Sequence, residues 1–320
     1  MMAPKRGQFV LSLDCEGKFG MADKISEFHH KHLTNKNLRR AYRGLVELLD
    51  RYEIRATFAF VGAFIQSPEE VGRNLPLLKR HAPLERWLAN FQDEYAARRY
   101  EGWFLPNALD IAASSGKHEI ASHGYTHLPF DYEGVTNDLR NLELSLAVDA
   151  ARSRGFRLET LIFPRNRVAG VEILRRHGFT GYRDFLPSSS GLLGKIANLA
   201  TEFQTFEKAQ DSSFRTSPDG IVAIPSGHFL NWRHGLRKAV PSSVTVRRWK
   251  ALIKSAGDMG GMAHLWLHPH NLITGHQQFE LLEEILVFAH HELSSGRIEN
   301  VTLADYCRRF ASSLCSPPVP

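Results

Sequence analysis

Apolar positions along the chain alternate between two periodicities. Short runs rich in apolar residues, as expected of buried strands, occur at 8–14, 55–62, 159–164, 221–227 and 261–268, and strands are also expected at 118–122 and 181–185. Between them lie stretches of helical period, as at 36–53, where Leu38, Leu45 and Leu49 share one face. The same pattern predicts helices near 108–117, 133–154, 168–177, 244–256 and 277–293, and a closing strand and helix within 298–310.

About seven or eight strand–helix units in succession predict a parallel α/β fold, either a barrel or a doubly wound sheet. We expect a single domain over residues 1–320, because no linker or low-complexity segment divides the chain. Residues 67–104 interrupt the alternation and carry Pro68, Pro76 and Pro83. They are expected to form an irregular insertion.

Composition limits the class of protein further. The chain has 320 residues and 43% hydrophobic content, enough for a large core. Its longest apolar run, about ten residues around 56–65, is roughly half of what a membrane span needs. The apolar stretch after Lys5 and Arg6 ends at Asp14, so no secretory signal is expected. Three cysteines without CxxC spacing argue against a disulfide framework, and a cytoplasmic setting is expected.

The formal charge of +6 is spread over many small clusters. It is compatible with an anionic substrate or a membrane-surface pathway. Because no single basic stripe with interleaved aromatics is present, no nucleic-acid partner is expected. The oligomeric state is left open by the sequence.

Chemically capable side chains follow four of the predicted strands. In a parallel barrel the catalytic groups lie at the carboxyl ends of the strands, so side chains at these positions would share one site. The strand-end groups are Asp14 and Glu16 after FVLSL, His123 after 118–122, Arg165 after 159–164, and His268 and His270 after MAHLWL.

His123 and His127 are four residues apart, and both rings would face one side if the segment forms a turn or a helix start. With Asp14 or Glu16 they supply two imidazoles and one carboxylate, the pattern of an open, catalytic metal site. Such ligands accept zinc, and also cobalt, manganese, iron or nickel. The alternative is a turn in which both imidazoles are only hydrogen-bonded.

The other strand-end groups have roles in the same chemistry. One of the two carboxylates would bind metal while the other acts as general base on metal-bound water. His268, in a turn stiffened by proline, suits a general acid that protonates a leaving amine. Arg165 could hold the catalytic carboxylate in its charged form, with Arg167 as an alternative.

Four further residues are candidates for substrate contact. His270 and Asn271 could orient His268 or touch the substrate. Trp103 offers a flat face that suits a sugar ring, although core packing is an equal alternative. Arg183 either contacts the substrate or forms an ion pair with Asp184.

Together these motifs resemble the polysaccharide deacetylase superfamily, carbohydrate esterase family four, with the NodB-homology fold. The resemblance rests on SLDCEG, SHGYTH, FPRNR and LWLH, and it spans roughly residues 8–306. The D-C-E form and the HPHN turn look more like the branch near bacterial surface-polysaccharide clusters.

The resemblance implies a distorted (β/α)₇ barrel and metal-dependent removal of an N-acetyl group from an amino sugar. It makes Asp14 the base, Glu16, His123 and His127 the ligands of zinc or a similar ion, Arg165 the orienting group and His268 the acid. The family usually has two adjacent aspartates where this chain has D-C-E, so base and ligand are interchangeable between Asp14 and Glu16.

Three other functions remain open at this point. An allantoinase-like relative of the fold would open a cyclic amide without needing metal. A sugar-binding protein on the same barrel would lack an acid or a ligand, and nothing obvious is missing. A mononuclear iron oxygenase also uses two histidines and one carboxylate, but normally on a β-sandwich. The substrate expected without a signal segment is a nucleotide-linked or lipid-linked N-acetyl sugar.

Overall fold

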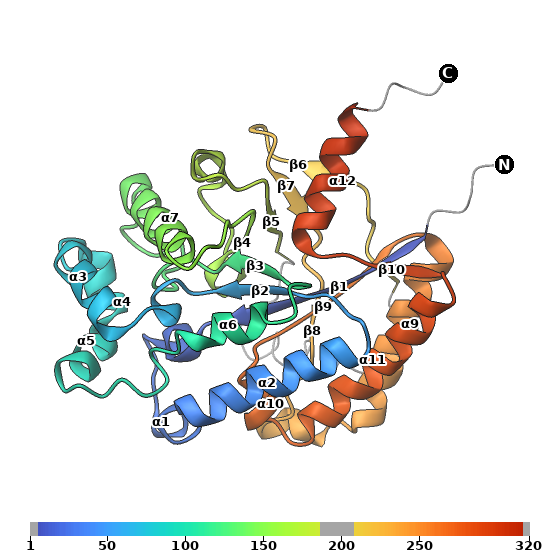
Figure 1. The fold of residues 1–320 in the computed structure, drawn as a ribbon, viewed down its shortest axis with the longest axis horizontal. Coiled ribbons are helices and arrows are strands. Elements are labelled where there is room, and N and C mark those ends of the chain that lie inside the picture. The colour runs from blue at the N-terminus through green and yellow to red at the C-terminus, as the bar shows by residue number, and fades with distance from the viewer. Residues whose placement is uncertain (1–5, 186–207, 316–320) are drawn as a thin grey trace.

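The computed structural model describes residues 6–185 and 208–315, which form one curled sheet with helices packed outside it (Figure 1). Its strands are β1 (Gly7–Cys15), β2 (Thr57–Phe60), β3 (Glu119–Ser122), β4 (Thr160–Ile162), β5 (Gly181–Arg183), β6 (Arg215–Thr216), β7 (Val222–Ile224), β8 (His228–Phe229), β9 (Met262–Leu267) and β10 (Ile298–Asn300).

The longer helices are α2 (Asn35–Arg51), α7 (Asn137–Arg152), α9 (Ser242–Met259), α11 (Gln278–Ser294) and α12 (Leu303–Cys315). Shorter ones are α1 (Glu27–His32), α3 (Pro68–Leu78), α4 (Ala82–Trp87), α5 (Ala89–Ala96), α6 (Asn107–Ala113) and α10 (Asn271–Thr274). The helix expected at 168–177 is a 3₁₀ helix over Val171–His177, bounded by Gly170 and Gly178, both with positive φ.

The strand order is β6-β7-β5-β4-β3-β2-β1-β9-β8, with β10 pairing beside the first half of β1. Every pair is parallel except β6 with β7. Within the part of the chain that is described, the edge strands β6 and β8 do not pair with each other. The curled, mostly parallel sheet confirms the expected α/β barrel of the distorted (β/α)₇ type.

The pairing between β3 and β4 is the shortest in this sheet. Strand β3 pairs with β4 through a single register position, Ser122 with Leu161, whereas β1 pairs with β9 over six positions. The His123 side chain also crosses this joint, because its Nδ1 lies 2.8 Å from the carbonyl oxygen of Ile162. The His123 imidazole thus bonds to β4 at a position where a longer pair of strands would form a backbone hydrogen bond.

The sequence forms these elements for local reasons. All nine residues of β1 are buried, as a central parallel strand covered on both faces requires. Helix α2 buries one apolar stripe that includes Leu38, Leu45 and Leu49. Thr34 caps it by accepting a hydrogen bond from the Asn37 amide. The opposite face of α2 carries mainly charged residues.

The prediction of an irregular insertion at 67–104 was wrong for most of that segment. The prolines there begin helices: Pro68 is the first residue of α3, and Pro83 lies in the first turn of α4. Ser67 and Glu70 form a capping box at the start of α3. Only Pro76 lies inside a helix.

The proposed sugar-binding role of Trp103 is also contradicted. Its side chain is 0% exposed and packs against Phe19 and Phe91, with ring centroids 5.1 Å away in both cases. The alternative reading of core packing was therefore correct for this residue.

No helix in the described ranges is long and apolar enough to cross a membrane. Cys15 and Cys307 are buried free thiols, and the side chain of Cys315 lies outside the described residues.

Replacing Trp103 tests its structural role. We expect Trp103→Ala to lower the free energy of unfolding by about 3–5 kcal/mol, because a large buried side chain leaves a cavity. Trp103→Phe should be milder, since the indole N–H has no hydrogen-bond partner among the described residues. Urea unfolding followed by circular dichroism measures both, and an unchanged midpoint for Trp103→Ala would contradict the core assignment.

Candidate active site

The carboxyl ends of neighbouring strands bring the predicted groups together. Asp14 is the penultimate residue of β1, and Glu16 follows that strand directly. His123 follows β3, and His268 follows β9, which lies beside β1. The strand-end argument therefore places residues more than 250 positions apart in one buried site.

Glu16, His123 and His127 form a compact cluster. The Oε2 atom of Glu16 lies 2.9 Å from Nε2 of His127 and 3.5 Å from Nε2 of His123, and the two Nε2 atoms are 3.1 Å apart. All three side chains are buried, and their ligand atoms lie within 4.8 Å of one another. This is the one group of three metal-ligating residues found within residues 6–185 and 208–315.

The donor set fits a divalent ion. The Nδ1 atom of His123 faces the Ile162 carbonyl, which can only accept, so Nδ1 carries the proton and Nε2 presents a lone pair. Two nitrogens bound at 2.0–2.1 Å by one tetrahedral zinc ion lie about 3.3 Å apart, close to the observed separation. Burial lowers the pKa of His127 against the opposing effect of Glu16, which favours the neutral ring that metals bind.

The histidine pair sits on a loop and not on a helix. The His123 amide still bonds to Phe60 and extends the sheet, after which Gly124 takes φ 76° and His127 takes φ 64°. A positive φ is strained for histidine, so this backbone must be held by its surroundings. Even so, the two rings meet edge to face with centroids 4.7 Å apart, as the i, i+4 argument required.

Glu143 on α7 holds this loop from behind. Its carboxylate accepts hydrogen bonds from the Tyr125 amide at 3.0 Å, the Thr126 amide at 2.9 Å and the Thr126 hydroxyl at 2.7 Å. The side chain is fully buried, and burial raises the pKa of Glu143 to about 7 despite these three donors. We infer that Glu143 is a positioning residue for the two histidines.

Asp14 is held by a buried arginine. Arg183 donates to both of its oxygens, at 2.8 Å and 2.7 Å, in the bidentate geometry that suits a guanidinium. Burial alone would raise the pKa of Asp14, but Arg183, with His123 and His268, outweighs it and lowers that pKa. The carboxylate is therefore kept ionised inside the protein.

Further partners fix Arg183 in place. It donates to Asn166 at 2.6 Å and to the Ser12 hydroxyl at 3.0 Å, and it stacks over the Trp266 ring. Ser12 in turn lies 2.8 Å from Nε2 of His264. This network gives hydrogen-bond partners to most of the N–H groups of the Arg183 guanidinium, as a buried charge requires.

The role predicted for Arg165 is wrong in geometry. Its guanidinium pairs with Asp23 and lies over the Trp87 ring, and no contact with Asp14 is present. Arg165 and Asn166 both have positive φ, so the chain turns away from the strand direction after β4. Arg167, the alternative, pairs with Asp131 on the surface. Arg183 makes the contact with Asp14 that was expected of Arg165.

His268 lies on the other side of the cluster. Its Nε2 is 3.5 Å from Oε1 of Glu16, and the ring keeps 23% exposure. The side-chain amide nitrogen of Asn271 lies 3.4 Å from Nδ1 of His268, a position from which it could orient the ring. His270 stacks on His268 with centroids 5.1 Å apart, and burial lowers the pKa of His270 to about 3. His270 and Asn271 are both buried.

Three functional features were missed in the sequence. Arg183 was paired with Asp184, but Asp184 lies 3.5 Å from Arg215 instead. The available signal was that Arg183 ends a buried strand, as Asp14 nearly does. Glu143 and His264 gave no signal, because a glutamate on a helix and a histidine in a strand look ordinary without their neighbours.

Comparison with known proteins supports this reading. The polysaccharide deacetylase family model matches residues 34–154, which include both histidines of the cluster. None of the curated proteins matches the chain. The match confirms the resemblance seen in the sequence, and with it the prediction of a hydrolase of the polysaccharide deacetylase type.

Solved structures share the fold at low identity. A Mycobacterium smegmatis protein provisionally classed as a polysaccharide deacetylase aligns over 100% of this chain and 95% of its own, with 13% identity and a TM-score of 0.58. A GH57-type branching enzyme from Pyrococcus horikoshii aligns over 95% and 70%, with 11% identity and a TM-score of 0.50. The fold thus hosts more than one chemistry, and the site must decide between them.

The Asp14–Arg183 pair gives a sharp stability test. We expect Arg183→Met to lower the free energy of unfolding by about 3–5 kcal/mol, because it leaves a buried carboxylate unpaired. The double variant Asp14→Asn/Arg183→Met should regain part of that loss. Arg165→Met, at a partly exposed pair, should change it by less than about 1 kcal/mol. Equal losses from Arg183 and Arg165 in chemical denaturation would contradict the assignment.

Glu143 can be tested by a matched pair of variants. We expect Glu143→Ala to weaken metal binding by about 10- to 100-fold, the usual effect of losing support behind ligands. Glu143→Gln should retain most of the affinity, because one amide oxygen can still accept both backbone N–H groups. Competition with a metal-sensitive dye measures both. Wild-type affinity in Glu143→Ala would show that the loop holds itself.

Proposed function

We propose that the protein is a metal-dependent hydrolase that removes an N-acetyl group from an amino sugar of a polysaccharide or its precursor. The observation that carries this proposal is the buried Glu16–His123–His127 cluster, with Asp14 on one side and His268 on the other. Family resemblance supplies the reaction class, and the side chains supply each chemical role.

Glu16, His123 and His127 would hold the ion. A bound divalent cation polarises a carbonyl oxygen and makes water more acidic. Burial alone would raise the pKa of Glu16, but His268 and His127 outweigh it and hold that pKa well below its usual value. Glu16 is thus a carboxylate at neutral pH, as a ligand must be. Zinc suits this set, and cobalt, manganese, iron and nickel remain alternatives.

Asp14 is the better candidate for the general base. It touches the cluster at its edge, with Oδ2 4.0 Å from Nε2 of His123, whereas Glu16 lies between both histidines. Arg183 uses one lone pair on each Asp14 oxygen, and a carboxylate has about four such sites. Asp14 can therefore still accept a proton from an attacking water. This geometry favours one of the two assignments that the sequence left open.

His268 would act as the general acid. Asn271 approaches Nδ1, which leaves Nε2 as the protonated atom facing the site. In the reaction, water oxygen bonds to the acetyl carbon while its proton passes to Asp14. The carbon–nitrogen bond then breaks, His268 gives a proton to the leaving nitrogen, and acetate and a free amine result.

The finer substrate assignment remains a proposal. His270 and Asn271 lie beside the acid, but both are largely buried, so positioning of His268 is their better supported role. A nucleotide-linked or lipid-linked sugar, a part in surface-polysaccharide synthesis and a cytoplasmic setting are predictions from the sequence.

Metal content and acetate release test the proposal together. We expect about one divalent ion per chain by mass spectrometry, and acetate release from N-acetylglucosamine oligomers. His123→Ala and His127→Ala should lower metal affinity by at least about 100-fold, more than the loss of an outer support does. His291→Ala, at a surface ring 70% exposed, is the matched histidine control.

The outcomes separate the alternatives. Metal that is lost in both cluster variants but not in His291→Ala, with acetate release that follows it, supports the proposal. Turnover that survives complete chelation would favour metal-free cyclic-amide chemistry. Metal without release from any N-acetyl sugar would favour sugar binding alone, and no metal after reconstitution would refute the proposed mechanism.

A further inference from the structure

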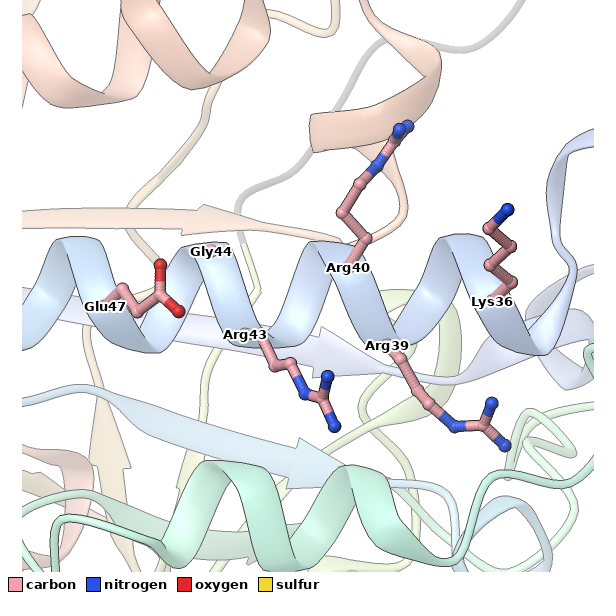
Figure 2. Close-up of a pocket in the computed structure, with 6 residues that line it drawn as sticks. All are labelled: Lys36, Arg39, Arg40, Arg43, Gly44 and Glu47. Carbon is pink, nitrogen blue, oxygen red and sulfur yellow. The ribbon is translucent and has the colours of Figure 1, made fainter.

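Four basic residues gather on the outer face of α2. Lys36, Arg39, Arg40 and Arg43, called here the α2 cations, line a shallow groove of about 420 Å³ with Gly44 and Glu47. Figure 2 shows Lys36 and Arg40 leaving one side of the helix and Arg39 and Arg43 the other. Glu47 is the one acidic residue in this lining, so the groove carries a net charge of +3.

None of the α2 cations forms an ion pair with another described residue within 4.0 Å. The nearest polar contact is from Arg39 to the Asn107 side chain, at 3.5 Å. Arginines elsewhere on the surface do have acidic partners: Arg51 with Glu283, Arg55 with Asp305, Arg99 with Glu94, Arg154 with Glu70, Arg167 with Asp131 and Arg297 with Glu292. Arg73, Arg80, Arg98 and Arg176 form no ion pair with a described residue either, so being unpaired is not peculiar to α2. The local feature of α2 is that four unpaired cations share one helical stripe.

The arrangement works against the stability of the helix. Lys36 and Arg40 are four residues apart, as are Arg39 and Arg43, and like charges at this spacing repel. Lys36 also lies in the first turn of α2, where the helix dipole disfavours a cation, and no residue of that turn is acidic. The Glu101 carboxylate accepts a hydrogen bond from the Asn35 amide there. Glu47, four residues after Arg43, offsets this repulsion at one position only, and the other three cations have no such neighbour in the lining.

The groove also lies on the functional side of the fold. Helix α2 connects β1 to its parallel neighbour β2, so its first turns lie at the carboxyl edge of the sheet, where Glu16 and His268 are. Figure 1 shows α1 leading directly into the amino-terminal end of α2. A ligand held by Lys36 would therefore lie toward the same edge as the candidate active site.

We propose that the α2 cations form a binding site for phosphate groups. Three guanidinium groups and one ammonium group line one groove and leave the helix in two directions, so pairs of them can reach the oxygens of a phosphoester or pyrophosphate. Such oxygens accept charge-assisted hydrogen bonds in pairs. Such groups occur on lipid headgroups and on soluble phosphorylated compounds. This site is separate from the deacetylase chemistry proposed above, and its test uses no turnover.

The experiment compares two sources of phosphate. One arm measures binding of inorganic pyrophosphate by calorimetry at low salt, and the other measures sedimentation with vesicles of phosphatidylcholine alone or mixed with phosphatidylglycerol. Both use wild type and Arg40→Gln/Arg43→Gln. The control is Arg51→Gln/Arg152→Gln, which removes the same charge from two paired arginines on α2 and α7.

We expect the α2 double variant to bind at least 10-fold more weakly while the control binds within about twofold of wild type, with affinity falling as salt rises. Binding of pyrophosphate identifies a soluble ligand, and binding only of the anionic vesicles identifies a lipid headgroup. No binding in either arm, or equal loss in both variants, would overturn the site.

Thermal stability provides the second readout. Because the α2 cations repel one another, Arg40→Gln/Arg43→Gln should melt at or above the wild-type temperature. A clear drop in Tm would mean that these side chains hold the fold, and the binding role would be withdrawn. Tighter binding of duplex DNA than of either phosphate source would also overturn the proposal, because the groove would then be a nucleic-acid contact.

Discussion

The site depends on one buried charge that cannot be left unpaired. The Arg183 guanidinium has no exposed side-chain surface, and burial of an isolated cation is prohibitively unfavourable. It must therefore meet Asp14, Asn166, Ser12 and the face of Trp266 at once. These partners come from β1, β9 and the loop after β4. By bringing these partners together, Arg183 holds the edge of the sheet that carries Glu16, His123 and His127.

The same requirement organises the second layer. His264 presents Nε2 to Ser12 because its other nitrogen faces the Pro225 carbonyl at 2.6 Å. Burial lowers the pKa of His264 to about 3, so this ring adds no charge beside Arg183. Glu143 plays the matching part on the other side, where it holds a loop whose backbone is strained at His127. The candidate catalytic side chains are thus fewer than the buried residues that hold them in position.

Periodicity was enough to predict the alternation of strands and helices, because most of the parallel strands, buried on both faces, appear in the sequence as short apolar runs. The rule that such strands end at one edge then grouped Asp14, Glu16, His123 and His268 correctly. It failed for Arg165, because two residues with positive φ redirect the chain after β4. The sequence PRNR contains no glycine or other signal that predicts positive φ at Arg165.

The predictions for the prolines at 67–104 and for Trp103 were wrong because each residue type fits two different environments. Proline breaks a helix interior but suits a first turn, and only the neighbouring Ser67 cap distinguishes these cases in α3. Trp103 fits both a sugar-binding edge and a core, and the choice depends on Phe19 and Phe91, which are distant in sequence from one another. Side-chain partners across the fold, and not local pattern, decided each of these positions.

The short pairing between β3 and β4 runs through the candidate active site. One register position, the His123 imidazole and a hydrogen bond from the Thr160 hydroxyl to Glu119 connect the two strands there. Asp14, Glu16 and both histidines stand on one side of this seam, whereas Arg183 and Asn166 stand on the other. Any widening of the seam would pull the cation away from Asp14 and free the His123 ring in one movement. The shortest strand pairing in the described sheet thus lies between the residues that set the charge state of the site.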